Sequence, residues 1–186
     1  MSVTSSKIPR QIKAVIFKGE KHTIVNYKER YKPAGTEEII NEEFPKKSDQ
    51  PRHGDLNRAM ERMKVHLILR CEFAKPLDKF EKALTPEWWK DHLYEDDPRF
   101  SNVKITGVIV TSKETIDTFQ ILGEVETLDK QIVKIKSPSI STIKGEGNIY
   151  PLVDEAKLHL ETLLLEADEY RKGKSSLGQL KMALVA

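Results

Sequence analysis

The residues that could carry out catalysis lie in patterns that fit no common enzyme site. Arg52-His53-Gly54 spells the triplet of histidine phosphatases, but it follows a polar loop, whereas that chemistry needs a buried strand directly before the triplet. None of the five histidines is four residues from another, and Cys71 is the single cysteine. The ligand spacing typical of zinc sites is therefore missing. We predict no enzyme activity, no metal site and no cofactor.

The acidic run at residues 95–97 is the remaining candidate for metal chemistry. Paired carboxylates hold Mg²⁺ in phosphoryl-transfer enzymes, so the enzyme class that it would suit is a metal-dependent nuclease. The common nuclease pattern also needs Glu-x-Lys on a following strand, and Glu124-Val125-Glu126 has an acid in place of the lysine. The run also ends a predicted helix before Pro98. A solvated turn is the favoured interpretation.

Basic residues with interleaved aromatic residues follow several predicted strands. Lysine on an open sheet face can contact phosphates and release counterions, while aromatic rings stack on unpaired bases. The predicted nucleic-acid-binding residues are Lys13, Lys18, Lys28, Arg30, Tyr27, Tyr31, Lys104, Phe119, Lys134, Lys136 and Lys144. The alternative is that these lysines only protect exposed strands from aggregation.

Trp88 and Trp89 suggest a contact with a protein partner. Adjacent side chains on a helix point about 100° apart, so one of the two is expected in the core and the other at the surface. The C-terminal tail adds the apolar residues Leu177, Leu180 and Met182. These features support an alternative function as a structural or adaptor protein, with the tail as a second docking surface.

Composition limits the class of protein. A chain of 186 residues suits one domain and is long enough to bury a core. Its net charge is only +2 although 32% of its residues are charged, so local clusters must carry any nucleic-acid binding. The single thiol and the lack of a long apolar run predict a cytoplasmic protein that does not enter a membrane.

Hydrophobic periodicity predicts the elements that would position these residues. We expect a hairpin at about 11–30, a loop at 31–53 with a short helix at 36–43, and a helix from Asp55, its N-cap, that Pro76 stops. Shorter helical segments follow up to Pro98. Three alternating strands are then expected at 103–109, 119–125 and 133–135. A Ser/Gly-rich loop at 137–149 and a long helix at 151–172 follow them.

The element order ββ-α-βββ-α predicts an α+β fold, in which an antiparallel sheet of about five strands carries helices on one face. Residues 1–10 are expected to form a flexible arm, residues 11–173 a single domain and residues 174–186 a flexible tail. Short links between the later strands favour antiparallel neighbours.

The sequence GVIV at 107–110, continuing to IVKIKSP at 132–138 and the long terminal helix, resembles small phage-encoded proteins without an assigned function. The likeness covers residues 54–173. It implies a place beside replication and recombination genes. The expected function is non-enzymatic binding of single-stranded DNA or RNA in replication, recombination or repair, and a homo-oligomer would suit it. The adaptor function, also viral, remains the alternative.

Overall fold

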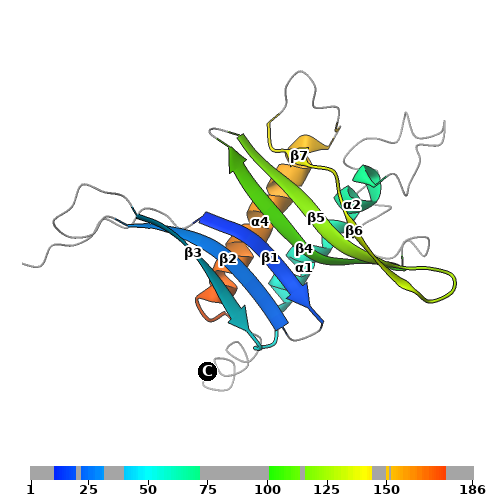
Figure 1. Ribbon diagram of the computed structural model, residues 1–186, viewed down its shortest axis with the longest axis horizontal. Helices are drawn as coiled ribbons and strands as arrows, with labels where there is room; N and C mark the ends of the chain where they lie inside the picture. The colour runs from blue at the N-terminus through cyan, green and yellow to red at the C-terminus, as the bar shows by residue number, and fades with distance from the viewer. Residues whose placement is uncertain are drawn as a thin grey trace, which may run out of the picture.

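An antiparallel sheet with helices packed on one face forms the framework of the protein, as a computed structural model shows (Figure 1). The structure describes residues 11–19, 22–31, 40–71, 101–113, 116–143, 150 and 152–174. The predicted α+β class and antiparallel sheet are therefore confirmed. The predicted arm, the helical segments before Pro98 and nearly all of the predicted tail lie outside the described residues.

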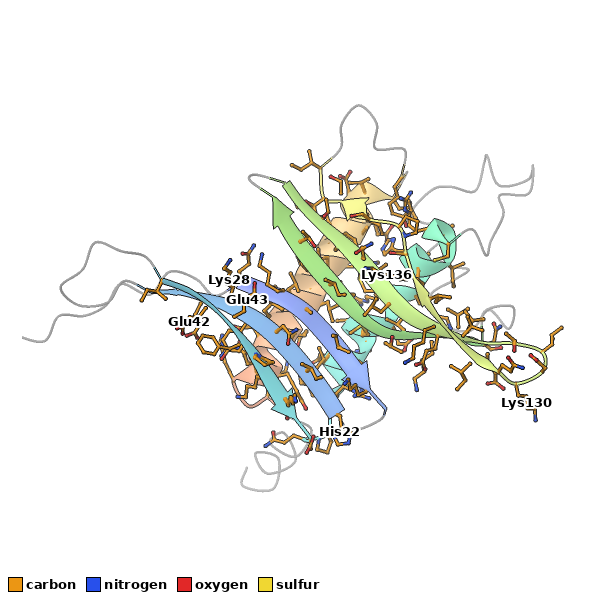
Figure 2. The ribbon with its side chains drawn as sticks, in the orientation of Figure 1. His22, Lys28, Glu42, Glu43, Lys130 and Lys136 are labelled. Carbon is orange, nitrogen blue, oxygen red and sulfur yellow. The ribbon has the colours of Figure 1, made fainter. Side chains whose placement is uncertain are left out.

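The sheet has seven strands rather than about five. They are β1 (Gln11–Lys18), β2 (His22–Tyr31), β3 (Ile40–Ser48), β4 (Val103–Lys113), β5 (Ile116–Glu126), β6 (Ile132–Lys136) and β7 (Ile140–Ser141). Their spatial order is β3-β2-β1-β4-β5-β6, and β7 also pairs with β5. The β5–β6 hairpin extends beyond the rest of the sheet, with Lys130 at its turn (Figure 2).

Strand β3 corrects the prediction of a loop and short helix at its position. It pairs with β2 over nine residue pairs, from Thr23↔Ser48 to Tyr31↔Ile40. Its sequence hid this role, because it lacks regular alternation and contains Pro45. Proline is tolerated here because β3 is an edge strand, where a missing N–H need not break the ladder.

The helix predicted from Asp55 is in fact two helices, α1 (Gly54–Glu61) and α2 (Lys64–Arg70). The N-cap of α1 is His53 rather than the predicted Asp55. The His53 ring accepts a hydrogen bond from the Leu56 N–H at 3.2 Å. The break at 62–63 was invisible in the sequence because both helices continue one apolar stripe. A turn between them tilts α2 onto β4 and β5.

The long helix α4 (Val153–Arg171) matches its prediction closely. It packs against α1 and β1. Acidic residues occupy its first turn and Arg171 its last, which complements the helix dipole. Gly173 follows with φ of 112°, a left-handed conformation that glycine adopts without strain.

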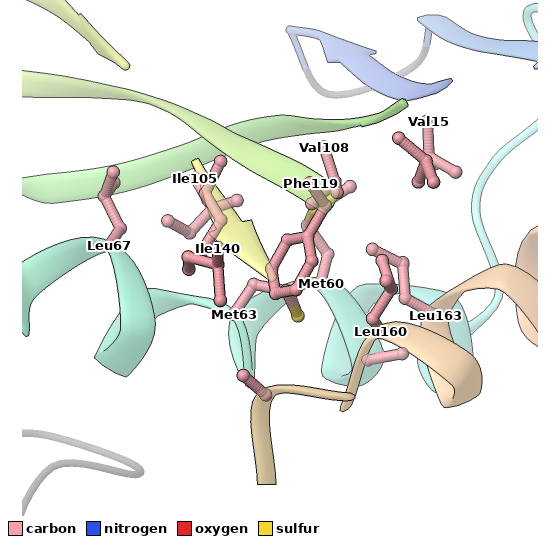
Figure 3. Close-up of a cluster of buried hydrophobic side chains, with 14 of the residues drawn as sticks. Val15, Met60, Met63, Leu67, Ile105, Val108, Phe119, Ile140, Leu160 and Leu163 are labelled. Atoms are coloured by element: carbon pink, nitrogen blue, oxygen red, sulfur yellow. The ribbon is translucent and has the colours of Figure 1, made fainter. Parts of the chain in front are cut away.

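The core lies between the sheet and these three helices (Figure 3). Met60, Met63 and Leu67 of the helices are fully buried against the strands. Gly123 permits this packing, since a Cβ at that position would lie 2.5 Å from Leu67 Cδ2. Burial raises the pKa of the thiol of Cys71, which follows α2 and is half-buried.

Two halves of the sheet meet at a short junction between β1 and β4. Only three residue pairs join these strands, whereas ten join β4 to β5. Gly107 lies at this junction, where a Cβ would come within 2.8 Å of the Val15 carbonyl oxygen. Beyond the paired residues the two strands diverge (Figure 1), and this divergence creates the site described next.

Candidate nucleic-acid interface

The predicted strand lysines gather on the face of the sheet that the helices leave uncovered. Val15, Val25 and Val108 are buried against the helices, and side chains alternate along a strand. The register therefore places the lysines of β1, β2, β4 and β6 on the opposite side, which we call the open face. Its predicted lysines are Lys18, Lys28, Lys104, Lys134 and Lys136, and Figure 2 labels two of them.

A cleft opens where β1 and β4 diverge. Its volume is about 750 Å³. It runs from the open face between the two strands down to α1, where Asn57 and Glu61 lie at its inner end. Four of the predicted lysines line it, namely Lys18, Lys104, Lys134 and Lys136. The strand order, which the sequence does not reveal, brings these lysines together from β1, β4 and β6.

Arg52 is the fifth cation of the cleft, and its position is fixed by several contacts. The guanidinium donates to the carbonyl oxygens of Gly19 at 3.0 Å and His22 at 3.2 Å, and Nε donates to Asn57 Oδ1 at 3.1 Å. It also lies over the Phe17 ring at 4.1 Å. These contacts tie the β1–β2 turn to α1 and hold a positive charge at the inner end of the cleft.

Positive charge exceeds negative charge in the cleft. Five cationic side chains line it against two acidic ones, Glu61 and Glu124, which leaves a formal excess of three positive charges. Glu124 sits between Lys104 and Lys134 in a row across β4, β5 and β6. One carboxylate between two lysines neutralises only part of their charge. The cleft therefore attracts anions, and its size suits ligands of nucleotide size.

Two of the three predicted stacking rings, Phe119 and Tyr27, do not lie on the open face. Phe119 is 1% exposed and packs in the core, so its ring cannot stack on a base. Tyr27 points to the helix face, where its ring stacks on Phe44 at 5.8 Å and the Arg171 guanidinium lies 4.9 Å above it. Within the described part of the chain, no Phe, Tyr or Trp side chain belongs to the open face, but Phe17 lines the cleft from the helix side of β1, beneath Arg52.

The other predicted residues do not join the cleft. Lys28 is on the open face but farther along β2, and Lys13 lies at the irregularity between Ile12 and Ala14 where the β1 register shifts. The structure does not describe the side chains of the remaining predicted residues, which are Arg30, Tyr31, Trp88, Trp89 and Lys144.

His53, singled out in the phosphatase-like triplet, is a buried ring beside a cluster of partly exposed charged side chains. His53, Asp55 and Glu166 offer potential metal ligands within 4.8 Å of one another. However, the Lys174 ammonium lies 3.1 Å from Asp55 Oδ2 and 2.8 Å from Glu166 Oε2, where a cation would bind. Nδ1 of His53 accepts the Leu56 N–H, so the proton of the neutral ring is on Nε2 and blocks coordination there. The cluster thus joins α1 to the end of α4.

A second group of buried polar residues links α2 to α4. His66 Nδ1 lies 2.6 Å from the Tyr150 hydroxyl, and His66 Nε2 lies 3.0 Å from His159 Nδ1. Both hydrogen bonds form if Tyr150 donates to His66 and His66 donates to His159. His159 Nε2 then lies 3.8 Å from Glu155 Oε1, which is an ion-pair distance rather than a hydrogen bond. Burial, and then the neighbouring His159, lower the pKa of His66 to about 3. Both histidines are packing residues, as their helical positions indicated.

Sequence reasoning missed Arg52, Asn57 and Glu61 as parts of the interface. Arg52 attracted notice only through its triplet, and the other two were helix surface residues without a distinguishing pattern. Their convergence depends on how α1 sits below the β1–β4 junction.

The chain was compared with models of protein families, with curated proteins and with solved structures, and no match was found in any of the three comparisons. Among the described helices, none is both long and apolar enough to cross a membrane.

Proposed function

We propose that the protein binds single-stranded nucleic acid on the open face, with the cleft between β1 and β4 as the centre of the interface. The observation that carries the proposal is the convergence of four lysines and Arg52 on one cleft with two acids. Lysine ammonium groups contact phosphates and release condensed counterions, which favours binding. Replication, recombination or repair is the proposed setting, and the resemblance to phage-encoded proteins supports it.

The size of the cleft favours a single strand over a duplex. A volume of about 750 Å³ holds a ligand of nucleotide size, whereas a double helix is too wide to enter a gap between two strands of one sheet. The open face carries no described aromatic side chain, and one face of the Phe17 ring inside the cleft is occupied by Arg52, so phosphate contacts supply most of the binding energy. Affinity should therefore fall steeply with salt concentration.

The test is fluorescence anisotropy of a labelled single-stranded oligonucleotide, titrated at low and moderate salt with a duplex as competitor. The double variant Lys134→Gln/Lys136→Gln removes two exposed lysines of the cleft. We expect the slope of log K against log salt to become shallower by about 1.4, roughly 0.7 for each lost phosphate contact.

The matched control is Lys64→Gln/Lys157→Gln, which removes the same charge from the helix layer. It should leave the slope nearly unchanged. Absence of binding by the natural protein at low salt would refute the proposal. Equal loss in both double variants would show that net charge, rather than the cleft, drives binding.

A function as an adaptor protein is the second candidate, and one observation favours it. Leu158 and Leu165 are seven residues apart on α4, and their side chains are 60% and 68% exposed. Leucines at this spacing share one helix face, which is suited to a protein contact. A defined oligomer in light scattering, lost in Leu158→Gln/Leu165→Gln and without affinity for oligonucleotides, would support this function over the first.

A further inference from the structure

We infer that the cleft receives one base of the bound strand, inserted between β1 and β4, and that it favours bases with an exocyclic amino group. The inference rests on the proposed function and specifies how the strand is held. It follows from which side of the sheet each lining residue occupies, as the strand register and the position of α1 on the helix side determine.

The outermost layer is cationic. Lys18, Lys104, Lys134 and Lys136 belong to the open face by their strand register, so their ammonium groups surround the entrance. A strand that crosses the open face would meet these groups with its phosphates. The entrance therefore selects the charged part of a nucleotide.

Apolar side chains form the middle layer. Ile16 and Leu122 lie on either side of Gly107 on the open face, and Phe17, Ile105 and Ile135 lie deeper, toward the helices. Phe17 is aromatic and the others are aliphatic, and all of them can bury apolar surface against a flat ring without needing hydrogen bonds. This layer suits the faces of a base, which are the apolar part of a nucleotide.

The inner end of the cleft is polar. The Asn57 amide and the Glu61 carboxylate come from exposed positions of α1, and Arg52 lies beside them. Arg52 is already held by Gly19, His22 and Asn57, so this layer is ordered before a ligand enters. A preordered site loses less conformational entropy on binding. The polar end therefore faces the hydrogen-bonding edge of an inserted base.

Glu61 determines the base preference. A carboxylate accepts hydrogen bonds but donates none, so it pairs with the amino group of cytosine, adenine or guanine. Thymine and uracil offer it only an imino N–H that lies between two carbonyl oxygens, and these oxygens repel the carboxylate. Cytosine and thymine have rings of the same size, so a comparison between them isolates this effect from the fit of the ring.

The experiment measures the affinity of three strands of equal length by fluorescence anisotropy at low salt: oligo(dC), oligo(dT) and a strand of abasic sites with the same phosphates. We expect oligo(dC) to bind about tenfold more tightly than oligo(dT), the effect of one good carboxylate–amino contact. The abasic strand should bind more weakly than both.

Two variants of equal charge separate the Glu61 contact from general electrostatics. Glu61→Ala should abolish the preference for oligo(dC), whereas Glu126→Ala, which removes an exposed carboxylate of β5 outside the cleft, should preserve it. Thermal unfolding of both variants confirms that they fold.

The outcomes distinguish this inference from the proposed function. If all three strands bind with equal affinity, base insertion is refuted and phosphate binding on the open face stands. If the abasic strand is weak but oligo(dC) and oligo(dT) bind alike, recognition by Glu61 is refuted. If no strand binds at low salt, the proposed function fails and the inference fails with it.

Discussion

The two faces of the sheet differ in how they treat charged and polar groups. On the helix side, the buried polar residues pair with one another, as His66 does with Tyr150 and His159. On the open face, cations outnumber acids around a cleft, and Glu124 alone lies between Lys104 and Lys134. The helix face pairs its polar groups within the core, whereas the open face concentrates positive charge, which is the basis of the proposed nucleic-acid binding. Substitutions on the two faces should therefore change different measurements.

The largest expected effect on stability comes from Phe119, at the centre of the helix face. Phe119→Ala should lower the free energy of unfolding by about 3–5 kcal/mol, because it removes a fully buried ring and leaves a cavity. Urea unfolding measures this loss. Affinity of the folded protein for an oligonucleotide should not change.

Phe119→Leu is the control, because it retains most of the buried volume and should cost much less. A small loss of stability combined with a large loss of affinity in Phe119→Ala would reverse the conclusion. It would show that Phe119 belongs to the binding surface, as the sequence predicted.

The second largest expected effect is a loss of stability in acid, which arises from the buried histidines of the helix face. His66 stays neutral in the folded protein down to its pKa of about 3, whereas the unfolded chain gains a proton near pH 6.5. The stability that depends on neutral His66 is therefore complete above pH 6.5 and is lost as the pH falls toward 3, by about 1.4 kcal/mol for each pH unit. Urea unfolding between pH 7 and pH 4.5 measures this slope.

His66→Gln keeps hydrogen-bonding groups at this position but does not titrate, so its stability should depend less on pH. His53 contributes in the same direction, since burial first, and then the Lys174 charge, lower its pKa as well. A remaining slope in His66→Gln is thus expected. Identical slopes in the two proteins would show that His66 is not buried as a neutral ring.

The sequence predicted the elements with strong periodicity and missed those without it. Strands β4 to β6 alternate and α4 has one apolar face, so their positions were predicted closely. Strand β3 reads as a loop because Pro45 and four charged residues interrupt any alternation. The break between α1 and α2 depends on how both helices pack against the sheet, which local sequence does not specify.

The candidate site shows the same limit. Alternation alone was enough to place the strand lysines opposite the core. It also indicated that Phe119 belongs with Ile121 on the inner face, so its prediction as a stacking ring contradicted the pattern. The cleft itself needed the strand order, because β1 and β4 are about ninety residues apart in sequence, and Arg52 and Glu61 approach it from other elements.

The smallest expected change in stability comes from a substitution on the open face, and this substitution should strengthen binding. Glu124→Gln removes the carboxylate between Lys104 and Lys134, so both ammonium groups become more available to phosphates. Affinity for a single-stranded oligonucleotide should rise severalfold at low salt. The slope of log K against log salt should steepen by about 0.7 if one further phosphate contact forms. Stability should change by less than about 0.5 kcal/mol, as is usual for surface substitutions.

Glu42→Gln provides the matched control, because Glu42 is an exposed acid of β3 whose register places it on the other side of the sheet. It removes the same charge from the protein without touching the cleft. If binding depends on the local balance of charge, only Glu124→Gln should strengthen it. An equal gain in both variants would mean that the ligand responds to net charge alone. The difference between the two faces would then concern stability and not recognition.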